Sequence, residues 1–553
     1  MSGAPSWQHP EAVGRAWAQV AGAVMLAAFA VAAVGSLFYP FGRDQGIFAG
    51  VADQILAGGV PFRDAWDQKG PATHYTYALV QLVFGRGLWG VRVFDLLAVA
   101  ATQWAIISLV RPRAGWFPAL TSALVFGGLH YRLNDWNTAQ PDAWGGMLAL
   151  AAIAVLARPA PKGSRGSVAT PGAVSVIRTV GAELVAGALI GVATLYKVTL
   201  AVMLLPPLVY ALARAHSDRR QMIARVLAIG AGFLLTLAFG LACLATQGGL
   251  GEFLEIQWIF NRLVHGGYSH PFSVHLQAFH GLALRCGLYL PFMAACAATA
   301  LMWRRERALT LALCAAVGTG LFLLIAQRQY FLYHAAPMYA PLAALVGIGV
   351  AWVPGHLLGA WRRGPWVRVL IGPALALALM WAIQPPYNIA GFRTYVFGSM
   401  SVAEYRTRFN RRDFPVHVYW DVANYIRETT RPDETVLVWA FEPLIAYLAD
   451  RRPVSRFGFH YPLTACRWPW RRASESLTEL CQAYRTEMVA AVRAHPPAII
   501  AVAFDDITIL TPRSSRDELM HFPELHGLIL TEYVRDKTIG RFDLWRRADR
   551  QQR

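Results

Sequence analysis

Two aspartates and a lysine in one short polar segment are the first candidates for chemistry in this sequence. Asp44, Asp67 and Lys69 follow an apolar stretch, 16–38, that is long enough to cross a bilayer. A charged side chain beside hydrocarbon is costly unless it is paired or takes part in a reaction. We therefore treat the three residues as a candidate functional site. The alternative is a solvated loop whose charges cap a helix.

The composition shows what must position these residues. Of the 553 residues, 56% are hydrophobic and 15% are charged, against about 25% charged in soluble proteins. Residues 1–383 are apolar runs separated by short basic or Gly/Pro-rich connections, whereas 384–553 have charges throughout. We predict a polytopic α-helical membrane domain, 1–383, followed by a domain of ordinary size, 384–553.

Eleven apolar runs of the first domain are predicted to span the membrane. Every second connection between them is basic, with sixteen Lys or Arg against Asp218 and Glu306. The positive-inside rule places these connections and the N-terminus in the cytoplasm. The other connections and the domain 384–553 are then expected outside. The ranges are 16–38, 89–110, 115–131, 142–157, 181–196, 198–213, 225–246, 281–301, 308–326, 331–353 and 366–383.

The second domain alternates between helical and strand-like patterns. Residues 435–441 and 498–504 read as buried strands, 531–535 and 540–545 as a terminal hairpin. Helices are expected at 416–429, 443–449, 474–494 and 514–530. This order predicts a small α/β fold. Its expected role is to recognise the substrate and to close over the membrane site.

Three further features limit the function. The net charge of +18 does not indicate nucleic-acid binding, because much of the excess lies in the basic connections, next to anionic lipid. No cofactor is predicted, since no ligand cluster has metal-site spacing, and dependence on a divalent metal stays open. Cys466 and Cys481 lie in the external domain, where a disulfide is permitted and two buried thiols are the alternative.

Outside the cytoplasm there is no supply of nucleotide sugars or ATP, so an activated group must arrive on a lipid, typically a polyprenyl phosphate. Its transfer requires a carboxylate that takes a proton from the acceptor hydroxyl. It also requires cations that hold the departing phosphate. Asp44 is the candidate base. The candidate cations on the outer side are Lys69, Lys197 and Arg328.

The order of several short segments resembles the bacterial branch of the GT-C glycosyltransferases, akin to protein O-mannosyltransferases and lipid A aminoarabinose transferases. The segments are Asp44-Gln-Gly, GGVPFRDAWDQKGP at 58–71, NTAQPD at 137–142, LYK at 195–197 and QRQYFLYHAAP at 327–337. The resemblance implies that Asp44 is the acidic residue of the first outer loop. It likewise implies that Lys69 belongs to a Lys-Pro-Pro-like motif and that Asp142 is the acid of the second outer loop.

Two residues depart from the pattern of that family. Gln45 follows Asp44, where many relatives have a second acidic residue, so a pair of carboxylates at this point is in doubt. Gly70 replaces a proline, which leaves the loop more flexible.

The sequence thus predicts an inverting glycosyltransferase on the outer face of the cytoplasmic (inner) membrane. It would move a hexosyl or pentosyl group from a polyprenyl-phosphate donor to a lipid, polysaccharide or protein hydroxyl of the cell envelope. Two other classes stay open: a secondary transporter, although no internal repeat is visible, and a non-catalytic scaffold on the same fold. The predicted roles are Asp44 as the base, Lys69, Arg328 and Lys197 as phosphate ligands, and Asp142, Gln140 and Asp67 as acceptor-orienting or supporting residues.

Overall fold

The computed structural model describes residues 10–158, 173–215, 218–265, 271–303, 305–359, 365–383, 392, 394–398, 400–467, 474–508 and 511–550. The chain divides into two compact units. The first comprises Met1–Phe38, Arg92–Phe239 and Pro271–Phe392, and the second comprises Tyr39–Val91, Gly240–His270 and Arg393–Arg553. The predicted domain start at Gln384 lies outside the described residues, and that boundary stays a prediction.

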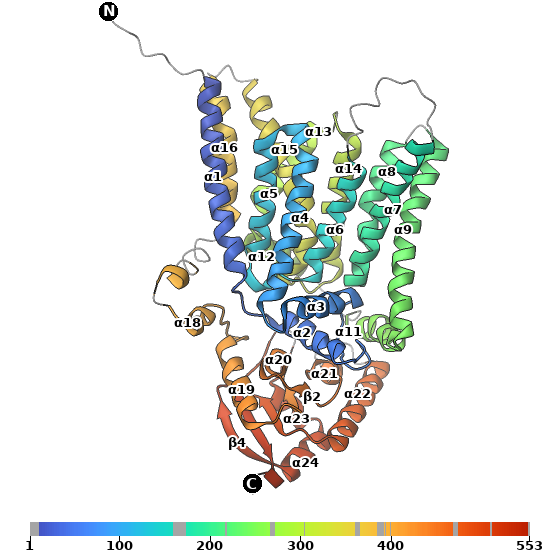
Figure 1. Cartoon of the computed structure of the whole chain (residues 1–553), viewed down its shortest axis with the longest axis vertical. Coiled ribbons are helices and arrows are strands. Elements are labelled where there is room, and N and C mark those ends of the chain that lie inside the picture. Colours follow the sequence, from blue (N-terminus) through green and yellow to red (C-terminus); the bar gives the residue numbers. More distant parts are fainter. Residues whose placement is uncertain are drawn as a thin grey trace, which may run out of the picture. The chain divides into compact units, whose positions relative to one another are not determined.

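The first unit is a bundle of apolar helices, several of which Figure 1 shows running side by side. Each of the eleven predicted ranges falls on helical structure. Two of the helices, α4 and α9, belong to this unit for most of their length. The helices are α1 (Pro10–Ser36), α4 (Trp89–Ala114), α5 (Trp116–Tyr131), α6 (Pro141–Leu156), α7 (Ala173–Tyr196), α8 (Leu205–Arg214), α9 (Arg219–Thr246), α12 (Phe272–Cys286), α13 (Tyr289–Met302), α14 (Arg307–Ala326), α15 (Tyr339–Gly359) and α16 (Pro365–Ile383). Short 3₁₀ helices cover Asn134–Trp136, Val198–Leu204 and Leu332–Met338.

The number of membrane spans is not confirmed at eleven. Among the described residues, four helices are long and apolar enough to cross a membrane: Ala16–Ser36, Trp89–Ala114, Arg219–Thr246 and Arg307–Ala326. The pair Phe272–Cys286 and Tyr289–Ala300, bent by 94°, would be a fifth if it forms one broken span. Several other expected spans have only 10–17 apolar helical residues, whereas about 20 are needed to cross the hydrocarbon.

Small residues allow the helices of the first unit to pack closely. A Cβ added at Gly187 of α7 would lie 1.9 Å from the carbonyl oxygen of Ile229 in α9. A Cβ at Gly232 would lie 2.0 Å from the carbonyl oxygen of Leu184. The backbones of α7 and α9 are therefore in direct contact, as is common where helices associate in lipid.

The second unit contains the segment after α1, the segment after α9 and the C-terminal α/β region. Its helices are α2 (Arg43–Leu56), α3 (Pro71–Phe84), α10 (Leu250–Leu254), α11 (Asn261–His265), α18 (Val402–Thr407), α19 (Val416–Thr429), α20 (Leu444–Ala449), α21 (Tyr461–Thr464), α22 (Glu475–Ala494), α23 (Ser515–Met520) and α24 (Pro523–Glu532). A π-helix covers Glu255–Phe260, and 3₁₀ helices cover Ala465–Arg467 and Ala548–Arg550.

Its sheet has five strands in the order β2-β1-β3-β5-β4. The strands β2 (Arg452–Pro453), β1 (Thr435–Trp439) and β3 (Ile499–Ala503) are parallel, and β5 (Phe542–Arg547) pairs antiparallel with β3 and with β4 (Tyr533–Ile539). The apolar runs of β1 and β3 are almost wholly buried, as in parallel strands covered on both faces. The α/β pattern and the terminal hairpin are confirmed, and β2 is an addition.

Cys466 and Cys481 are both free thiols in this structure. They are close in space, since the backbone N–H of Cys466 donates to Sγ of Cys481 at 3.2 Å. The structure therefore contains two thiols, which is the alternative to a disulfide that the sequence leaves open.

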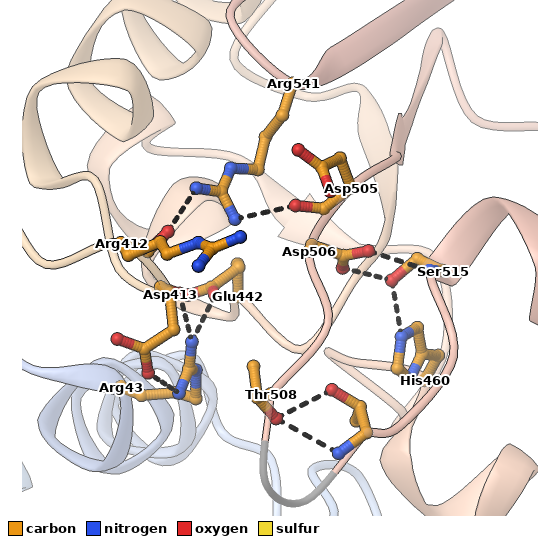
Figure 2. A network of polar contacts seen from close by, with 11 residues as sticks. Arg43, Arg412, Asp413, Glu442, His460, Asp505, Asp506, Thr508, Ser515 and Arg541 are labelled. Atoms are coloured by element: carbon orange, nitrogen blue, oxygen red, sulfur yellow. Dashed lines mark hydrogen bonds and ion pairs between the residues drawn. The ribbon is translucent and has the colours of Figure 1, made fainter.

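A polar network lies beyond the carboxyl ends of β1 and β3 (Figure 2). The Ser515 hydroxyl donates to Asp506, and its oxygen lies 2.6 Å from Nε2 of His460. These residue types occur in nucleophilic triads, but there histidine stands between serine and aspartate. Here the serine stands in the middle, and all three side chains are buried. The three side chains therefore join the segment after β3 to the start of α23 and to the residue before α21, and they do not expose a nucleophile.

Candidate active site

Asp44 lies in the first turn of α2, where the helix dipole favours a negative charge. The turn is closed by Gln45, whose Oε1 accepts from the backbone N–H of Gly42 at 2.8 Å. Gln45 therefore caps the helix, which gives this departure from the family pattern a structural role. Oδ2 of Asp44 is buried and has no hydrogen-bond partner among the described residues. A buried acceptor of this kind is available to a substrate hydroxyl.

Asp67 lies in the loop between α2 and α3 and is only 3% exposed. Burial raises the pKa of its carboxyl from 3.8 to about 7, the positive charge of Lys69 opposes this shift, and the negative charge of Asp44 adds to it. The electrostatic influence of Asp44 shows that two carboxylates share one neighbourhood. Asp67 is therefore a second carboxyl near Asp44, where the sequence places a pair of adjacent carboxylates in doubt.

His74 is a third buried group at this position, which the sequence did not single out. It lies in the first turn of α3, and its Nε2 is 3.4 Å from Oδ2 of Asp67. Burial lowers the His74 pKa to about 3, so the imidazole is neutral at physiological pH. The available signal in the sequence is a histidine shortly after the Lys69-Gly-Pro turn.

The second group of predicted residues lies in the first unit. Nζ of Lys197 contacts both carboxylate oxygens of Asp142, at 2.8 and 3.1 Å, and donates to Oε1 of Gln327 at 2.5 Å. Asp142 is in the first turn of α6, and Lys197 directly follows the end of α7. The carboxylate is 1% exposed and the lysine side chain 12%. The structure therefore brings together a predicted cation and a predicted acid that are 55 residues apart.

Close packing explains how Gln327 reaches this pair. A Cβ added at Gly146 of α6 would lie 2.6 Å from Cα of Pro337. The segment 327–337 therefore runs against the helix that begins next to Asp142. Arg328 in the same segment is exposed and has a left-handed backbone, with φ 55°. Such a conformation is uncommon for a residue other than glycine and often marks a functional segment.

Gln140 precedes α6 and is 2% exposed, and its Oε1 has no hydrogen-bond partner among the described residues. The loop that contains it is held by Asp95 of α4, which sequence reasoning missed. Asp95 accepts from the backbone N–H of Ala139 at 3.0 Å and from Nε1 of Trp144 at 2.8 Å. Nε2 of His130 lies 2.8 Å from its other oxygen. An aspartate inside an apolar run was the available signal.

The predicted residues thus form two groups. Asp44, Asp67 and Lys69 lie together in the second unit, and Gln140, Asp142, Lys197 and Arg328 lie in the first. Among the described residues, no group of three His, Cys, Asp or Glu side chains is placed to hold a metal ion. Each group combines carboxylate with cation. That combination suits proton removal from a hydroxyl and binding of a phosphate.

Comparison with known proteins bears on this arrangement. Residues 68–244 match the protein family described as dolichyl-phosphate-mannose-protein mannosyltransferase. The structure is similar to that of ArnT from Cupriavidus metallidurans bound to undecaprenyl phosphate, with a TM-score of 0.58, 15% identity, and coverage of 96% of this chain and 98% of that chain. ArnT in the apo state gives 0.59 and 13%, with coverage of 95% and 97%.

An oligosaccharyltransferase from Archaeoglobus fulgidus gives a TM-score of 0.49 at 12% identity, over 86% of this chain and 67% of that chain. A search of curated protein sequences gives no significant match.

The chain therefore has the fold of the GT-C glycosyltransferases, and its resemblance to mannosyltransferases and aminoarabinose transferases is confirmed. Its apolar helices agree with a membrane protein of that class. The matched stretch, 68–244, includes Lys69, Asp142 and Lys197, and it begins after Asp44.

Proposed function

We propose that this protein transfers a sugar from a polyprenyl-phosphate donor to a hydroxyl of an envelope lipid, polysaccharide or protein. The observation that supports it best is the first-loop group. There a carboxylate with a buried, unpartnered oxygen, Asp44, shares its surroundings with the buried Asp67 and with Lys69. The undecaprenyl phosphate bound to ArnT in the similar structure supports the class of donor.

Asp44 is assigned as the base that takes the proton of the acceptor hydroxyl. The attack inverts the anomeric carbon, where positive charge builds up as the bond to the phosphate oxygen breaks. Lys69 and Arg328 neutralise the departing polyprenyl phosphate. Asp67, with a pKa of about 7, is the supporting carboxyl, because burial keeps part of its population protonated at neutral pH.

Two roles are assigned to Lys197. It remains a phosphate ligand in this proposal, and its ion pair with Asp142 holds the ammonium in place until the phosphate arrives. Asp142 and Gln140 are the acceptor-orienting residues. Gln140 is the better placed to contact an acceptor hydroxyl, since its buried Oε1 has no partner among the described residues.

The location follows from the same chemistry. We assign the reaction to the outer face of the cytoplasmic membrane, with the N-terminus in the cytoplasm and the α/β region outside. The basic connections of the membrane half support this orientation. Reporter fusions after Arg214, in a basic connection, and after Glu479, in the α/β region, should report opposite sides of the membrane. The same side for both fusions would contradict the assignment.

The test is transfer from a lipid-linked sugar by the purified protein in detergent or nanodiscs. Asp44→Asn keeps the shape and removes the basicity, so the rate should fall about 10²–10⁴-fold while donor binding survives. The matched control is Asp433→Asn, which removes the same charge from a side chain that is 72% exposed. Near-normal transfer by a folded Asp44→Asn protein would place the base elsewhere, with Asp142 next. Uptake of solute into vesicles without transfer would instead identify a transporter.

A further inference from the structure

A pocket of about 390 Å³ lies within the second unit, and Asp44 is not among the residues that line it. Its wall includes Gly46, Gly50 and Asp53 of α2, which repeat at helical spacing along one face. The volume is at the small end of the range for small-molecule sites.

Two glycines on this wall have different reasons for lacking a side chain. A Cβ at Gly46 would lie 2.9 Å from Cβ of Leu444, so packing of α2 against α20 requires glycine there. A Cβ at Gly50 would meet nothing within 4 Å. Glycine in a helix interior is unfavourable relative to alanine. Packing does not explain Gly50, whereas open space for a ligand does.

Two arginines of the wall are neutralised by carboxylates. Nε of Arg86 lies 2.9 Å from Oδ2 of Asp53 and 3.3 Å from Oδ1 of Asp450. Nε and Nη2 of Arg456 donate to the two carboxylate oxygens of Glu487, at 2.7 and 2.9 Å. A phosphate or carboxylate ligand would have to compete with these acids for the guanidiniums.

The other two arginines of the wall, Arg451 and Arg452, are also poor ligands for an anion. The guanidinium of Arg451 is used within the fold, since Nε donates to the Thr430 hydroxyl at 2.8 Å and Nη2 donates to the Thr430 carbonyl at 2.7 Å. Arg452 is exposed, and an ion pair that is open to solvent contributes little. The lining therefore favours a neutral ligand over an anion.

The same lining suits a ligand with several hydroxyls. A hydroxyl both donates and accepts, so it is satisfied by a wall that presents carboxylates, which accept, beside guanidiniums, which donate. Gln81 adds an acceptor: its amide nitrogen donates to the carbonyl of Ala49 at 3.2 Å, and its buried Oε1 has no partner among the described residues. The orientation of the amide is assigned from this hydrogen bond, because a carbonyl oxygen only accepts.

Aromatic side chains complete the wall. The pocket is lined by Trp66, Tyr447 and Phe459, and the guanidinium of Arg86 lies 4.1 Å from the centre of the Tyr447 ring. Apolar rings beside fixed polar groups are the usual composition of small-ligand pockets. A sugar ring has an apolar C–H face and a polar edge, and matches both parts.

We infer that this pocket is a second, non-catalytic binding site for a neutral sugar residue. That the sugar belongs to the acceptor glycan rests on the proposed function, whereas saccharide binding itself does not. Because Asp44 is not among the residues that line the pocket, a sugar held here would anchor the acceptor without occupying the position of the base.

The test is binding of neutral sugars to the purified full chain, measured by ligand-observed NMR. The probes are glucose, mannose, galactose, N-acetylglucosamine and maltose, with inorganic phosphate as the anion. We expect a dissociation constant on the order of 1 mM for at least one sugar, as for a small ligand of this size. Gly50→Leu should fill the pocket and weaken that binding at least tenfold. Gly527→Leu is the matched control, since Gly527 of α24 also has open space around it and lies outside the pocket.

Asp53→Asn gives a second readout that leaves the pocket open. It should weaken sugar binding about tenfold through the loss of a charged acceptor. If no sugar binds, or if binding is unchanged in both Gly50→Leu and Asp53→Asn, the inference is wrong. Preferential binding of phosphate at this pocket would overturn it as well. Sugar binding that persists in an Asp44→Asn protein without transfer activity separates this site from the proposed reaction.

Discussion

The raised pKa of Asp67 gives a prediction of stability whose size follows from the structure. The carboxyl is 3% exposed, and its pKa is about 7 in the fold against 3.8 for an ordinary aspartate. The difference of about 3 in pKa corresponds to ~4 kcal/mol of folding free energy. Asp67→Asn has nearly the same shape and does not titrate, so it isolates this contribution.

The sign follows from proton binding. Between about pH 4 and about pH 7 the unfolded chain has released the Asp67 proton, whereas the folded chain retains it. The stability of the wild-type protein relative to Asp67→Asn should therefore be highest near pH 4. It should fall by up to ~4 kcal/mol as the pH rises to about 7 and stay constant above that.

The assay is thermal unfolding of both proteins in detergent from pH 4 to pH 8, with the difference in midpoint as the readout. The infrared band of a protonated carboxyl that is missing in Asp67→Asn gives the pKa directly. Asp64→Asn is the control: the hydrogen bond from Arg63 lowers the Asp64 pKa below 3.8, so its difference from the wild type should stay constant between pH 4 and pH 8. A difference that does not change with pH, or a titration midpoint near 4, would refute the reasoning.

Three further changes test other parts of the structure. Lys69→Ala should raise the KM for the lipid donor more than it lowers kcat, because the phosphate loses a point charge; an unchanged KM would contradict the assignment. Arg43 lies 2.6 Å from Glu442 in a buried ion pair (Figure 2). Arg43→Ala should therefore destabilise the fold by ~3–5 kcal/mol, and Glu442→Gln in that background should recover part of the loss. Additive losses of the two variants in thermal unfolding would exclude the pairing. Lys197→Met leaves the carboxylate of Asp142 buried and without its ion pair. This single variant should therefore lower the unfolding midpoint more than the double variant Lys197→Met with Asp142→Asn. Equal losses would show that the ion pair contributes little to stability.

Local sequence was enough to predict much of the fold. The length and position of the apolar runs predicted the helices of the first unit, because hydropathy is a sum over neighbouring residues. The runs at 435–441 and 498–504 predicted β1 and β3 in the same way. The number of membrane spans was not determined by these runs. Helices such as Pro141–Leu156 are too short to cross the hydrocarbon by length alone, and packing against other helices decides their placement.

The candidate residues were also found from the sequence, by type and by order along the chain. Asp44 and Lys69 stood out because charges next to an apolar run need a reason. What each residue does within the fold was not visible at that level. Lys197 was chosen as a cation for phosphate, and the structure adds its contact with Asp142, which depends on α6 packing against α7.

Tertiary structure alone decided the properties that depend on distant neighbours. The pKa of Asp67 is set by the atoms that exclude water from it, and the pocket beside Gly50 is closed by residues near the other end of the chain, such as Phe459. Desolvation and enclosure are properties of a volume, to which segments far apart in the sequence contribute. The sequence therefore determined which residues were available for chemistry, and the fold determined their charge, their partners and the space around them.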